Sequence, residues 1–406
     1  MDRTERQNLC IQRWVKAGGK ASIVAATGTG KTRISLMLIQ KLIKKSPKLF
    51  VLIVVPTEFL KEQWTTQLIQ WNLINNCQIV IINSVVKKDW NCNLLIIDEC
   101  HLAASEQHQQ VFEKVHYDML LCLTATLQRL DGGESIIKKY APVCDTITLD
   151  EALKNGWISP VREYAVLLDV DLTEYKKYDR CFNGYFAYFN FDFNVAMKCC
   201  TDWTYRTTYA KKMGLPVKEV LAMSMDWMRY MRKRKEFIMS HPKKAEVCKK
   251  ILAARTDKKC ITFSATIKDS EALGVGEVLH SKQSKKHNKE VLDRFNAAKT
   301  GVLCTNKACD QGVDVPGLNV GIIMSIDSSK IRKTQRVGRI CRFEEGKIAE
   351  LFTLIIKGTQ EWKWFQNSNT SSNVSIINEE QLDQVLKGEI INTRQREQIE
   401  DVKFRF

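Results

Sequence analysis

Small residues and one lysine stand together near the N-terminus in a pattern suited to binding phosphate. Residues 25–32 read Ala-Ala-Thr-Gly-Thr-Gly-Lys-Thr, after an apolar run and before a helical pattern. Small residues let successive backbone amides point at one anion, and the N-terminus of the following helix adds roughly half a positive charge. In such a loop Lys31 reaches the β- and γ-phosphates of a nucleotide, and the Thr32 hydroxyl binds Mg²⁺. The alternative is a glycine-rich turn that binds no nucleotide. The predicted nucleotide contacts are Thr27, Gly28, Thr29, Gly30, Lys31 and Thr32.

Two adjacent carboxylates, Asp98 and Glu99, end the apolar run Leu94–Ile97. Ligands in open α/β sheets bind at the carboxyl ends of the strands. Asp98 therefore suits Mg²⁺, and Glu99 suits the base that orients an attacking water. An Asp-Glu pair alone is more often an ordinary strand end, and His101 alone is as compatible with a surface loop. Placed 67 residues after Lys31, with several strands between, the pair predicts the second half of a phosphoryl-transfer site.

Apolar runs alternate with helical patterns from about residue 20 to 150, and again from about 241 to 365. The runs are continuous rather than alternating, as expected of strands buried on both faces of a parallel sheet. Between them lie helical patterns such as Thr32–Lys44 and Glu58–Trp71. That order predicts an α/β fold with two doubly wound parallel sheets. The strand candidates are Ser22–Ala26, Phe50–Val55, Gln78–Ile82, Leu94–Ile97, Met119–Leu123, Cys260–Phe263, Gly301–Cys304, Gly321–Met324 and Ala349–Ile355.

The composition changes between the two α/β blocks. Residues 182–193 contain seven aromatic side chains, and residues 206–249 carry 12 Lys or Arg against four Asp or Glu. We expect a mostly helical insertion in which most of the aromatics form a small core and one or two stay exposed at the tip. The residues from 366 onward are polar and predict a short helical appendage. The predicted domains are therefore residues 1–158, 159–240, 241–365 and 366–406.

The chain of 406 residues carries 62 Lys and Arg against 46 Asp and Glu, a formal net charge of +16. Such an excess favours a polyanionic partner, either nucleic acid or an anionic membrane. The longest apolar run, Leu49–Val55, is far shorter than the about 20 residues of a spanning helix, and the N-terminus has no signal-peptide core. The 14 cysteines show no paired spacing for zinc and are interpreted as reduced. Nucleic acid is therefore the predicted partner, with no membrane contact.

A series of motifs in fixed order resembles the superfamily 2 helicases and translocases over nearly the whole chain. The phosphate loop is followed by Pro56-Thr57 with Leu60, Gln63 and Trp64, similar to motif Ia. Residues 98–101 read Asp-Glu-Cys-His, which resembles the DExH form of motif II, and residues 124–126 resemble motif III. Residues 259–264, 305–315 and 335–342 resemble motifs IV, V and VI in turn, and Gln7 is similar to the glutamine that reads adenine.

The resemblance implies two RecA-like lobes that hold ATP and Mg²⁺ at their seam. Arg339 and Arg342 would then contact the γ-phosphate as arginine fingers, Gln335 would sense it, and Asp314 would hold an arginine or link the site to motif V. Because motif VI lies over 300 residues from the phosphate loop, this requires the second lobe to face the first; the alternative is a solvated helix face or a nucleic-acid patch. The predicted catalytic residues are Lys31, Asp98, Glu99, Gln335, Arg339 and Arg342, with Thr32 and Asp98 as metal ligands.

One departure from the family pattern is Arg6, which stands beside Gln7 where relatives often have an aromatic residue. Either the Arg6 guanidinium stacks on the adenine, or Gln7 does not read the base. Since the motifs begin almost at Met1, we expect no accessory domain before the first lobe.

The resemblance also implies a single strand of nucleic acid that runs across both lobes. Short polar side chains hold phosphates without reading sequence, although structural capping explains each of them equally well. The insertion adds a basic stretch at residues 232–235, and its aromatics could stack on bases or wedge a fork. The predicted contacts are Pro56, Thr57, Gln63, Asn83, Ser84, Arg232, Lys233, Arg234, Lys235, Ser264, His280, Ser281, Thr305 and Asn306.

The leading functional hypothesis is an ATP-dependent DNA helicase or translocase that unwinds or branch-migrates forked or junction DNA in replication, recombination or repair. The DECH form of motif II and the Gly156-x-x-x-Pro160 stretch favour this hypothesis, and the nearest resemblance is to small phage helicases. An ATP-dependent RNA helicase is the alternative. A non-catalytic nucleic-acid-binding protein is a third hypothesis, which the intact Lys31, Asp98 and Glu99 oppose. We expect a monomer in the cytosol of a bacterium or a phage-infected host.

Overall fold

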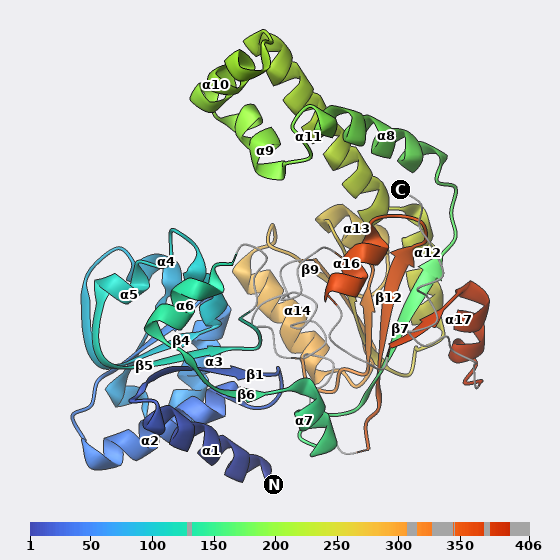
Figure 1. Ribbon diagram of the computed structural model, residues 1–406. Helices are drawn as coiled ribbons and strands as arrows, with labels where there is room; N and C mark the ends of the chain where they lie inside the picture. The colour runs from blue at the N-terminus through green and yellow to red at the C-terminus, as the bar shows by residue number, and fades with distance from the viewer. Residues whose placement is uncertain (128–131, 307–314, 327–343, 345, 369–373, 390–406) are drawn as a thin grey trace.

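The computed structural model describes residues 1–127, 132–306, 315–326, 344, 346–368 and 374–389, which form two lobes and a helical insertion (Figure 1). The first lobe contains a six-stranded sheet in the order β3-β2-β4-β5-β1-β6, and all of its pairings are parallel. Its strands are β1 (Lys20–Ala25), β2 (Val51–Val55), β3 (Cys77–Ile81), β4 (Trp90–Asp98), β5 (Val115–Thr124) and β6 (Val143–Ile147).

The first sheet is covered on both faces, and its strand β2 is apolar and buried at every position. In β2, Val51, Ile53 and Val55 belong to one core, and Leu52 and Val54 belong to the other. Residues of these helices complete the first core: α1 (Arg3–Lys16), α2 (Lys31–Lys45) and α3 (Glu58–Gln70). The second core is completed by α4 (Ile82–Val85), α5 (Val111–Lys114) and α6 (Glu134–Tyr140). The predicted doubly wound parallel sheet is thus confirmed.

The second lobe contains a seven-stranded parallel sheet in the order β13-β7-β12-β11-β8-β10-β9. Its strands are β7 (Val161–Leu168), β8 (Lys259–Phe263), β9 (Glu277–Leu279), β10 (Gly301–Thr305), β11 (Val320–Ile323), β12 (Ala349–Ile356) and β13 (Val374–Ile377). The described helices of this lobe are α12 (Pro242–Ala253), α13 (Ile267–Ala272), α14 (Lys285–Ala297), α16 (Glu361–Ser368) and α17 (Glu379–Leu386). The helix α7 (Leu149–Lys154) precedes the crossing from one sheet to the other.

Two predicted domain boundaries differ from the structure. Strand β7 pairs with β12 and β13, so the second lobe begins at Val161 and the insertion leaves from within that lobe rather than from between the lobes. Strand β13 pairs with β7, so residues 374–377 belong to the second sheet and not to an appendage. The reason is that strand order in a sheet depends on long-range pairing, which local composition does not encode.

The insertion consists of four helices and stands away from both sheets (Figure 1). They are α8 (Thr173–Ala187), α9 (Phe193–Thr201), α10 (Trp203–Met213) and α11 (Val217–Met239). The buried centre includes Phe189 and Trp227, which makes this a small independent core as expected. Asp192 and Asp202 accept hydrogen bonds from backbone amides in the first turns of α9 and α10, and these caps fix where the two helices start.

Candidate nucleotide and nucleic-acid site

The phosphate loop joins the carboxyl end of β1 to the first residue of α2. Gly28 and Gly30 have φ values of 87° and 93°, in the left-handed region that favours glycine. A Cβ on Gly30 would lie 2.5 Å from Gln7 Nε2, so a side chain there would collide with the neighbouring helix. Lys31 Nζ donates to the Ala25 carbonyl oxygen at 3.2 Å, which folds the ammonium back across the loop. The sequence thus produces the strand–loop–helix geometry that binds phosphate.

Helix α1 is fastened to this loop by two side chains. Gln7 Nε2 donates to the Thr29 carbonyl oxygen at 3.0 Å, and Arg3 Nη2 donates to the Gly28 carbonyl oxygen at 2.5 Å. Gln7 Oε1 and Thr27 Oγ1 are buried, and neither forms a hydrogen bond with the part of the chain that the structure describes. Two buried polar atoms beside a phosphate loop fit a bound nucleotide that would supply their partners. Sequence reasoning missed Arg3.

The proposed stacking of Arg6 on adenine is wrong. Its Nη1 and Nη2 donate to the two carboxylate oxygens of Asp145 at 2.6 and 3.0 Å, and its Nε donates to Glu151 at 2.6 Å. Burial disfavours the charged guanidinium, but the hydrogen bonds with both carboxylates outweigh this cost and raise the pKa of Arg6. Arg6 therefore anchors α1 to the carboxyl-terminal half of the first lobe. The partners are about 140 residues away, which no local pattern reveals.

Asp98 ends β4 in a buried position. Trp64 Nε1 donates to Asp98 Oδ2 at 2.9 Å, and the Glu99 backbone amide donates to Oδ1 at 3.0 Å. Burial, followed by the negative charge of Glu99, raises the pKa of Asp98 to about 6, while Trp64 and Lys31 oppose that rise. Trp64 is thus an orienting residue for Asp98, a role that the sequence did not predict.

Glu99 begins a polar chain that links the ends of β4 and β5. Its φ of 50° lies in the left-handed region, which is rare for a residue with a side chain. His101 Nδ1 lies 3.4 Å from Glu99 Oε2 and 3.0 Å from Thr124 Oγ1, and the Thr124 hydroxyl donates to the Thr126 carbonyl oxygen at 2.8 Å. His101 is only 2% exposed, so the alternative of a surface loop residue is wrong. The motif II and motif III segments are therefore in direct contact.

The predicted phosphate contacts of the first lobe follow β2 and β3 at the same sheet edge as the phosphate loop. Thr57 Oγ1 accepts from the Leu60 amide at 3.3 Å and caps α3. Asn83 is exposed and its Oδ1 lies 2.6 Å from His108 Nε2, while Ser84 is exposed beside it. Pro56 and Gln63 are half-buried. Asn83 and Ser84 are thus the most accessible members of this set.

The predicted contacts of the second lobe are mostly buried. Ser264 and Thr305 follow or end β8 and β10, and the Ser264 amide donates to the Thr305 carbonyl oxygen at 2.8 Å. His280 is buried and its Nε2 lies 3.2 Å from Glu271 Oε1, whereas Asn306 is buried next to Thr305. Of this set only Ser281 is exposed. Burial favours a structural role for the side chains of the others.

The basic stretch of the insertion divides into two kinds of residue. Arg232, Lys233 and Lys235 are exposed on α11. Arg234 is buried, its Nη2 donates to Gln360 Oε1 at 2.5 Å, and its guanidinium lies 4.1 Å from the centre of the Phe182 ring. The prediction that Arg234 contacts nucleic acid is therefore wrong, because its charge is turned inward.

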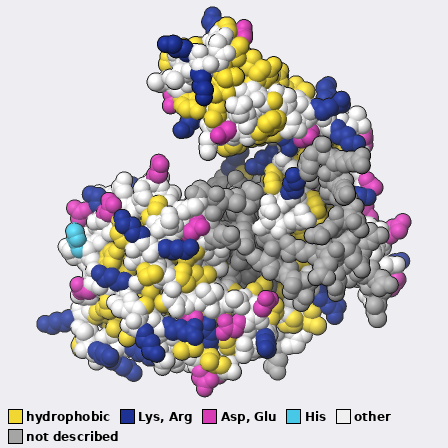
Figure 2. All heavy atoms as spheres, viewed as in Figure 1, with side chains coloured by type: hydrophobic (Ala, Val, Ile, Leu, Met, Phe, Trp, Pro, Cys, Tyr) yellow, Lys and Arg dark blue, Asp and Glu magenta, His cyan; other side chains and the backbone are white. Residues whose placement is uncertain are grey.

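The aromatic run of the insertion also divides. Four of the seven rings pack in or against the buried core: Phe182, Tyr185, Phe186 and Phe189. Three are exposed at the turn between α8 and α9: Tyr188, Phe191 and Phe193. Phe191 has a φ of 56°, an unusual conformation for a bulky residue, and it is 61% exposed. Figure 2 shows hydrophobic side chains gathered on the visible face of the insertion.

Four predicted residues lie outside the described residues: Asp314, Gln335, Arg339 and Arg342. Their roles stay predictions.

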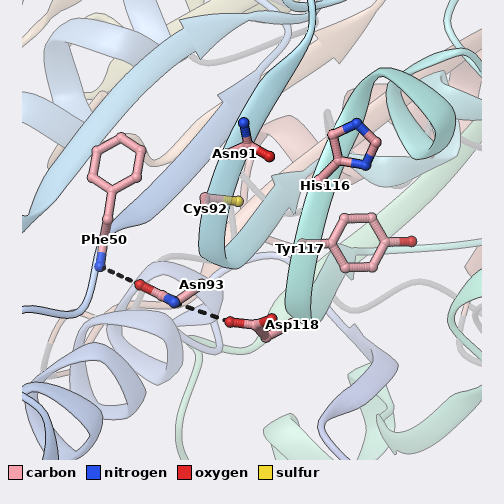
Figure 3. Close-up of a pocket in the computed structure, with 7 residues that line it drawn as sticks. All are labelled: Phe50, Asn91, Cys92, Asn93, His116, Tyr117 and Asp118. Carbon is pink, nitrogen blue, oxygen red and sulfur yellow. Dashed lines mark hydrogen bonds between the residues drawn. The ribbon is translucent and has the colours of Figure 1, made fainter.

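A separate hollow of about 500 Å³ lies at the amino ends of the strands of the first sheet, opposite the phosphate loop (Figure 3). There Asn93 Oδ1 accepts from the Phe50 amide at 3.0 Å, and Asn93 Nδ2 donates to Asp118 Oδ2 at 2.9 Å. These bonds join the amino-terminal halves of β4 and β5 to the residue before β2. Because the hollow is at the amino ends of the strands, it is distinct from the nucleotide site.

The donor chemistry of the site fits Mg²⁺. Within the described ranges, no three His, Cys, Asp or Glu side chains cluster to hold a metal by themselves. Mg²⁺ is usually held by one or two carboxylates together with substrate phosphates, which matches the buried Asp98 beside the phosphate loop. None of the described helices has the length and apolarity to cross a membrane.

Comparison with known proteins gives two family matches in chain order. Residues 1–91 and 83–129 match the model of the type III restriction enzyme res subunit, and residues 243–344 match the helicase conserved C-terminal domain. The DNA 3'-5' translocase XPB2 of Sulfurisphaera tokodaii is 23% identical over 373 residues, which cover 87% of this chain and 81% of that protein. Together, the two family matches and this relative support assignment to helicase superfamily 2. Its two helicase domains indicate an enzyme that hydrolyses ATP, normally with Mg²⁺.

Other proteins similar to this chain match over a smaller part of it or at lower identity. The putative ATP-dependent RNA helicase QP509L of African swine fever virus is 32% identical over 136 residues, which cover 27% of this chain and 26% of the viral protein. Among solved structures, the Pyrococcus furiosus Hef helicase domain has a TM-score of 0.53 at 15% identity and covers 90% of this chain and 98% of its own. Dbp5 of S. cerevisiae bound to RNA and ADP BeF3 has a TM-score of 0.60 at 13% identity, covering 94% and 91%. These structures confirm the predicted fold of two RecA-like lobes.

Proposed function

We propose that the protein is an ATP-dependent DNA helicase or translocase of the DExH type. The observation that carries this proposal is the convergence of Lys31, Asp98 and Glu99 at one sheet edge. Trp64 orients Asp98, and the phosphate loop is held by Gln7 and Arg3. In this arrangement Lys31 binds the β- and γ-phosphates, and Glu99 orients the water that attacks the γ-phosphate. Asp98 and Thr32 would hold Mg²⁺, which would supply positive charge beside the phosphates.

The second lobe completes the site in this proposal. Arg339 and Arg342 approach the γ-phosphate, Gln335 senses its presence, and Asp314 holds an arginine. ATP then favours a closed pair of lobes, and hydrolysis removes the bridge between them. Only a difference in affinity between the two states converts ATP turnover into movement along a strand.

The nucleic-acid path runs across both lobes to the insertion. Pro56, Thr57, Asn83 and Ser84 border it on the first lobe, and Ser281 does so on the second. From α11, the exposed Arg232, Lys233 and Lys235 supply phosphate contacts. The exposed rings of Tyr188, Phe191 and Phe193 are suited to stacking on unpaired bases at a fork or junction.

DNA is favoured over RNA by the length of the matches. The relative that aligns over 87% of the chain is named a DNA translocase, whereas the viral relative named an RNA helicase aligns over only 27%. An RNA helicase is the second candidate, because a structural neighbour was solved bound to RNA. More specifically, we propose that the protein processes DNA junctions in replication, recombination or repair, and that it comes from a phage.

The test is ATP hydrolysis measured with single-stranded DNA, forked DNA, four-way junctions and RNA of matched length. We expect DNA to stimulate turnover and RNA to do so weakly or not at all. Lys31→Ala should abolish turnover with every polymer. Stimulation by RNA alone would replace the DNA proposal with the RNA helicase.

A further inference from the structure

The insertion meets the second lobe at a partly buried polar joint, formed by residues 357–361 after the end of β12. Arg234 of α11 donates from Nη2 to Gln360 Oε1 at 2.5 Å. The Gln360 backbone amide donates to the Tyr175 hydroxyl of α8 at 3.2 Å. The outgoing and returning helices of the insertion are therefore both fastened to one residue of the second lobe.

Arg234 is held in this position from the insertion side as well. Its guanidinium lies 4.1 Å from the centre of the Phe182 ring, and its Nε lies 3.0 Å from Asp179 Oδ1, an ion pair without hydrogen-bond geometry. Arg234 is only 7% exposed. A buried, paired charge contributes little net stability, and its best-attested use is to fix one arrangement among several. Arg234 is thus placed to set the angle at which the insertion leaves the lobe.

The residue after Gln360 joins three further elements. Glu361 is fully buried, and Lys244 at the start of α12 donates to its Oε1 at 2.5 Å. The amide of Ile356 at the end of β12 donates to Oε2 at 2.9 Å, and the amide of Ile326 after β11 donates to Oε1 at 3.4 Å. One carboxylate therefore connects the carboxyl ends of β11 and β12 with the helix that follows the insertion.

The joint is linked through Ile326 to the segment that contains the predicted γ-phosphate contacts. Ile326 is the last described residue before the segment that contains Gln335, Arg339 and Arg342. We infer that Gln360 is a positioning residue. It contacts Arg234 of the insertion and directly precedes Glu361, which holds the ends of β11 and β12. The angle of the insertion and the position of these strand ends therefore depend on each other. Nucleic acid held by the insertion then alters ATP turnover through this joint. The inference rests on the proposed function.

The experiment separates coupling from binding. Gln360→Ala removes the acceptor of Arg234 and leaves Glu361 in place, and Gln360→Glu restores an acceptor of the same length. Arg234→Met breaks the same contact from the insertion side. Arg294→Gln is the matched control, because it breaks an exposed ion pair with Glu277 in the same lobe. For each variant we would measure ATP turnover without nucleic acid, turnover with saturating single-stranded DNA, and the Kd of a labelled DNA oligonucleotide.

We expect Gln360→Ala and Arg234→Met to keep the DNA-free turnover and the oligonucleotide Kd of the wild type. Their stimulation by DNA should fall about fivefold or more, the lower end of usual allosteric coupling. Gln360→Glu and Arg294→Gln should respond as the wild type does. If the wild type is stimulated and Gln360→Ala is stimulated equally, the joint does not couple and the proposed function stands. If no polynucleotide stimulates the wild type, the proposed function fails and the inference fails with it.

Discussion

The two lobes are built on similar parallel sheets but use the carboxyl ends of their strands differently. In the first lobe this edge presents ionisable groups, among them Lys31 and Asp98, around a glycine-rich loop. In the second lobe Ser264 and Thr305 stand at strand ends but are buried and bond within the lobe. The second lobe instead carries the long helical insertion between β7 and α12. In the proposed mechanism the first lobe therefore supplies the phosphate-binding groups, and the second lobe carries the insertion that contacts nucleic acid.

The lobes do share one device, an inward-facing arginine that anchors a helix. Arg6 fastens α1 to Asp145 in the first lobe, and Arg234 fastens α11 to Gln360 in the second. From sequence, Arg234 was predicted as a nucleic-acid contact, and stacking of Arg6 on adenine was one of two alternatives. A run of charges shows that cations are present, but packing decides which of them turns inward.

The largest effect on ATP turnover should come from removing the predicted arginine finger of the second lobe. Arg339→Ala should lower kcat by about 10³-fold or more, because an arginine finger stabilises charge that develops only in the transition state. ATP affinity should change little. Single-turnover hydrolysis and nucleotide binding measure the two separately, with Arg294→Ala as an exposed control in the same lobe. Weaker ATP binding at an unchanged kcat would give Arg339 a ground-state role instead.

The next largest effect should come from the first lobe's base. Glu99→Gln should lower turnover by about 10² to 10⁴-fold while ATP still binds, because the amide cannot accept the proton of the attacking water. The variant should stay bound to DNA in the presence of ATP. Glu113→Gln, at an exposed site of the same lobe, is the control. Turnover near the wild-type rate would remove Glu99 from the chemistry.

A smaller effect, on the Mg²⁺ requirement, should follow from removing the hydrogen bond that orients Asp98. Trp64→Phe removes the Nε1 donor to Asp98 Oδ2 and keeps most of the ring. The Mg²⁺ concentration for half-maximal ATP hydrolysis should rise about tenfold, the lower end for loss of a group that orients a metal ligand. Trp90→Phe is a matched control, because its Nε1 donates to the Val85 carbonyl oxygen in the same lobe. An unchanged Mg²⁺ requirement would mean that Trp64 serves packing alone.

The smallest effect should appear in the insertion. Replacing Arg232, Lys233 and Lys235 together with glutamine should weaken DNA binding and reduce the slope of log K against log salt by about 0.7 for each lost phosphate contact. Arg234 is left intact so that the insertion keeps its anchor. Glutamine at Lys44, Lys45 and Lys48, all exposed on the first lobe, is the control. Equal slopes in both triple variants would exclude a DNA contact by this stretch.

Most central strands could be predicted because an apolar run buried on both faces is visible in sequence, as in Val51–Val55. Three of the four missed strands, β6, β9 and β13, lie at sheet edges and are short. An edge strand has one paired neighbour and less burial, so its apolar run is interrupted, as Asp145 and Thr146 interrupt β6. The fourth, β7, begins with Val-Arg-Glu and lies next to a strand almost 190 residues later.

The loop residues of the site could be predicted because their spacing is local. Thr27 to Thr32 are consecutive, and Asp98 and Glu99 are adjacent. The residues that hold these loop residues in place could not be predicted, because they are distant from them in sequence. Trp64 reaches Asp98 across 34 residues and Arg3 reaches Gly28 across 25. Such contacts depend on how helices pack on the sheet.

The most direct measurement is a crystal structure of the Glu99→Gln protein with Mg²⁺ and ATP. The predicted result is a γ-phosphate contacted by Lys31 from the first lobe and within hydrogen-bond distance of Arg339 or Arg342 from the second. A nucleotide held by the first lobe alone, with both guanidinium groups engaged elsewhere in a closed molecule, would contradict the two-lobed ATP site.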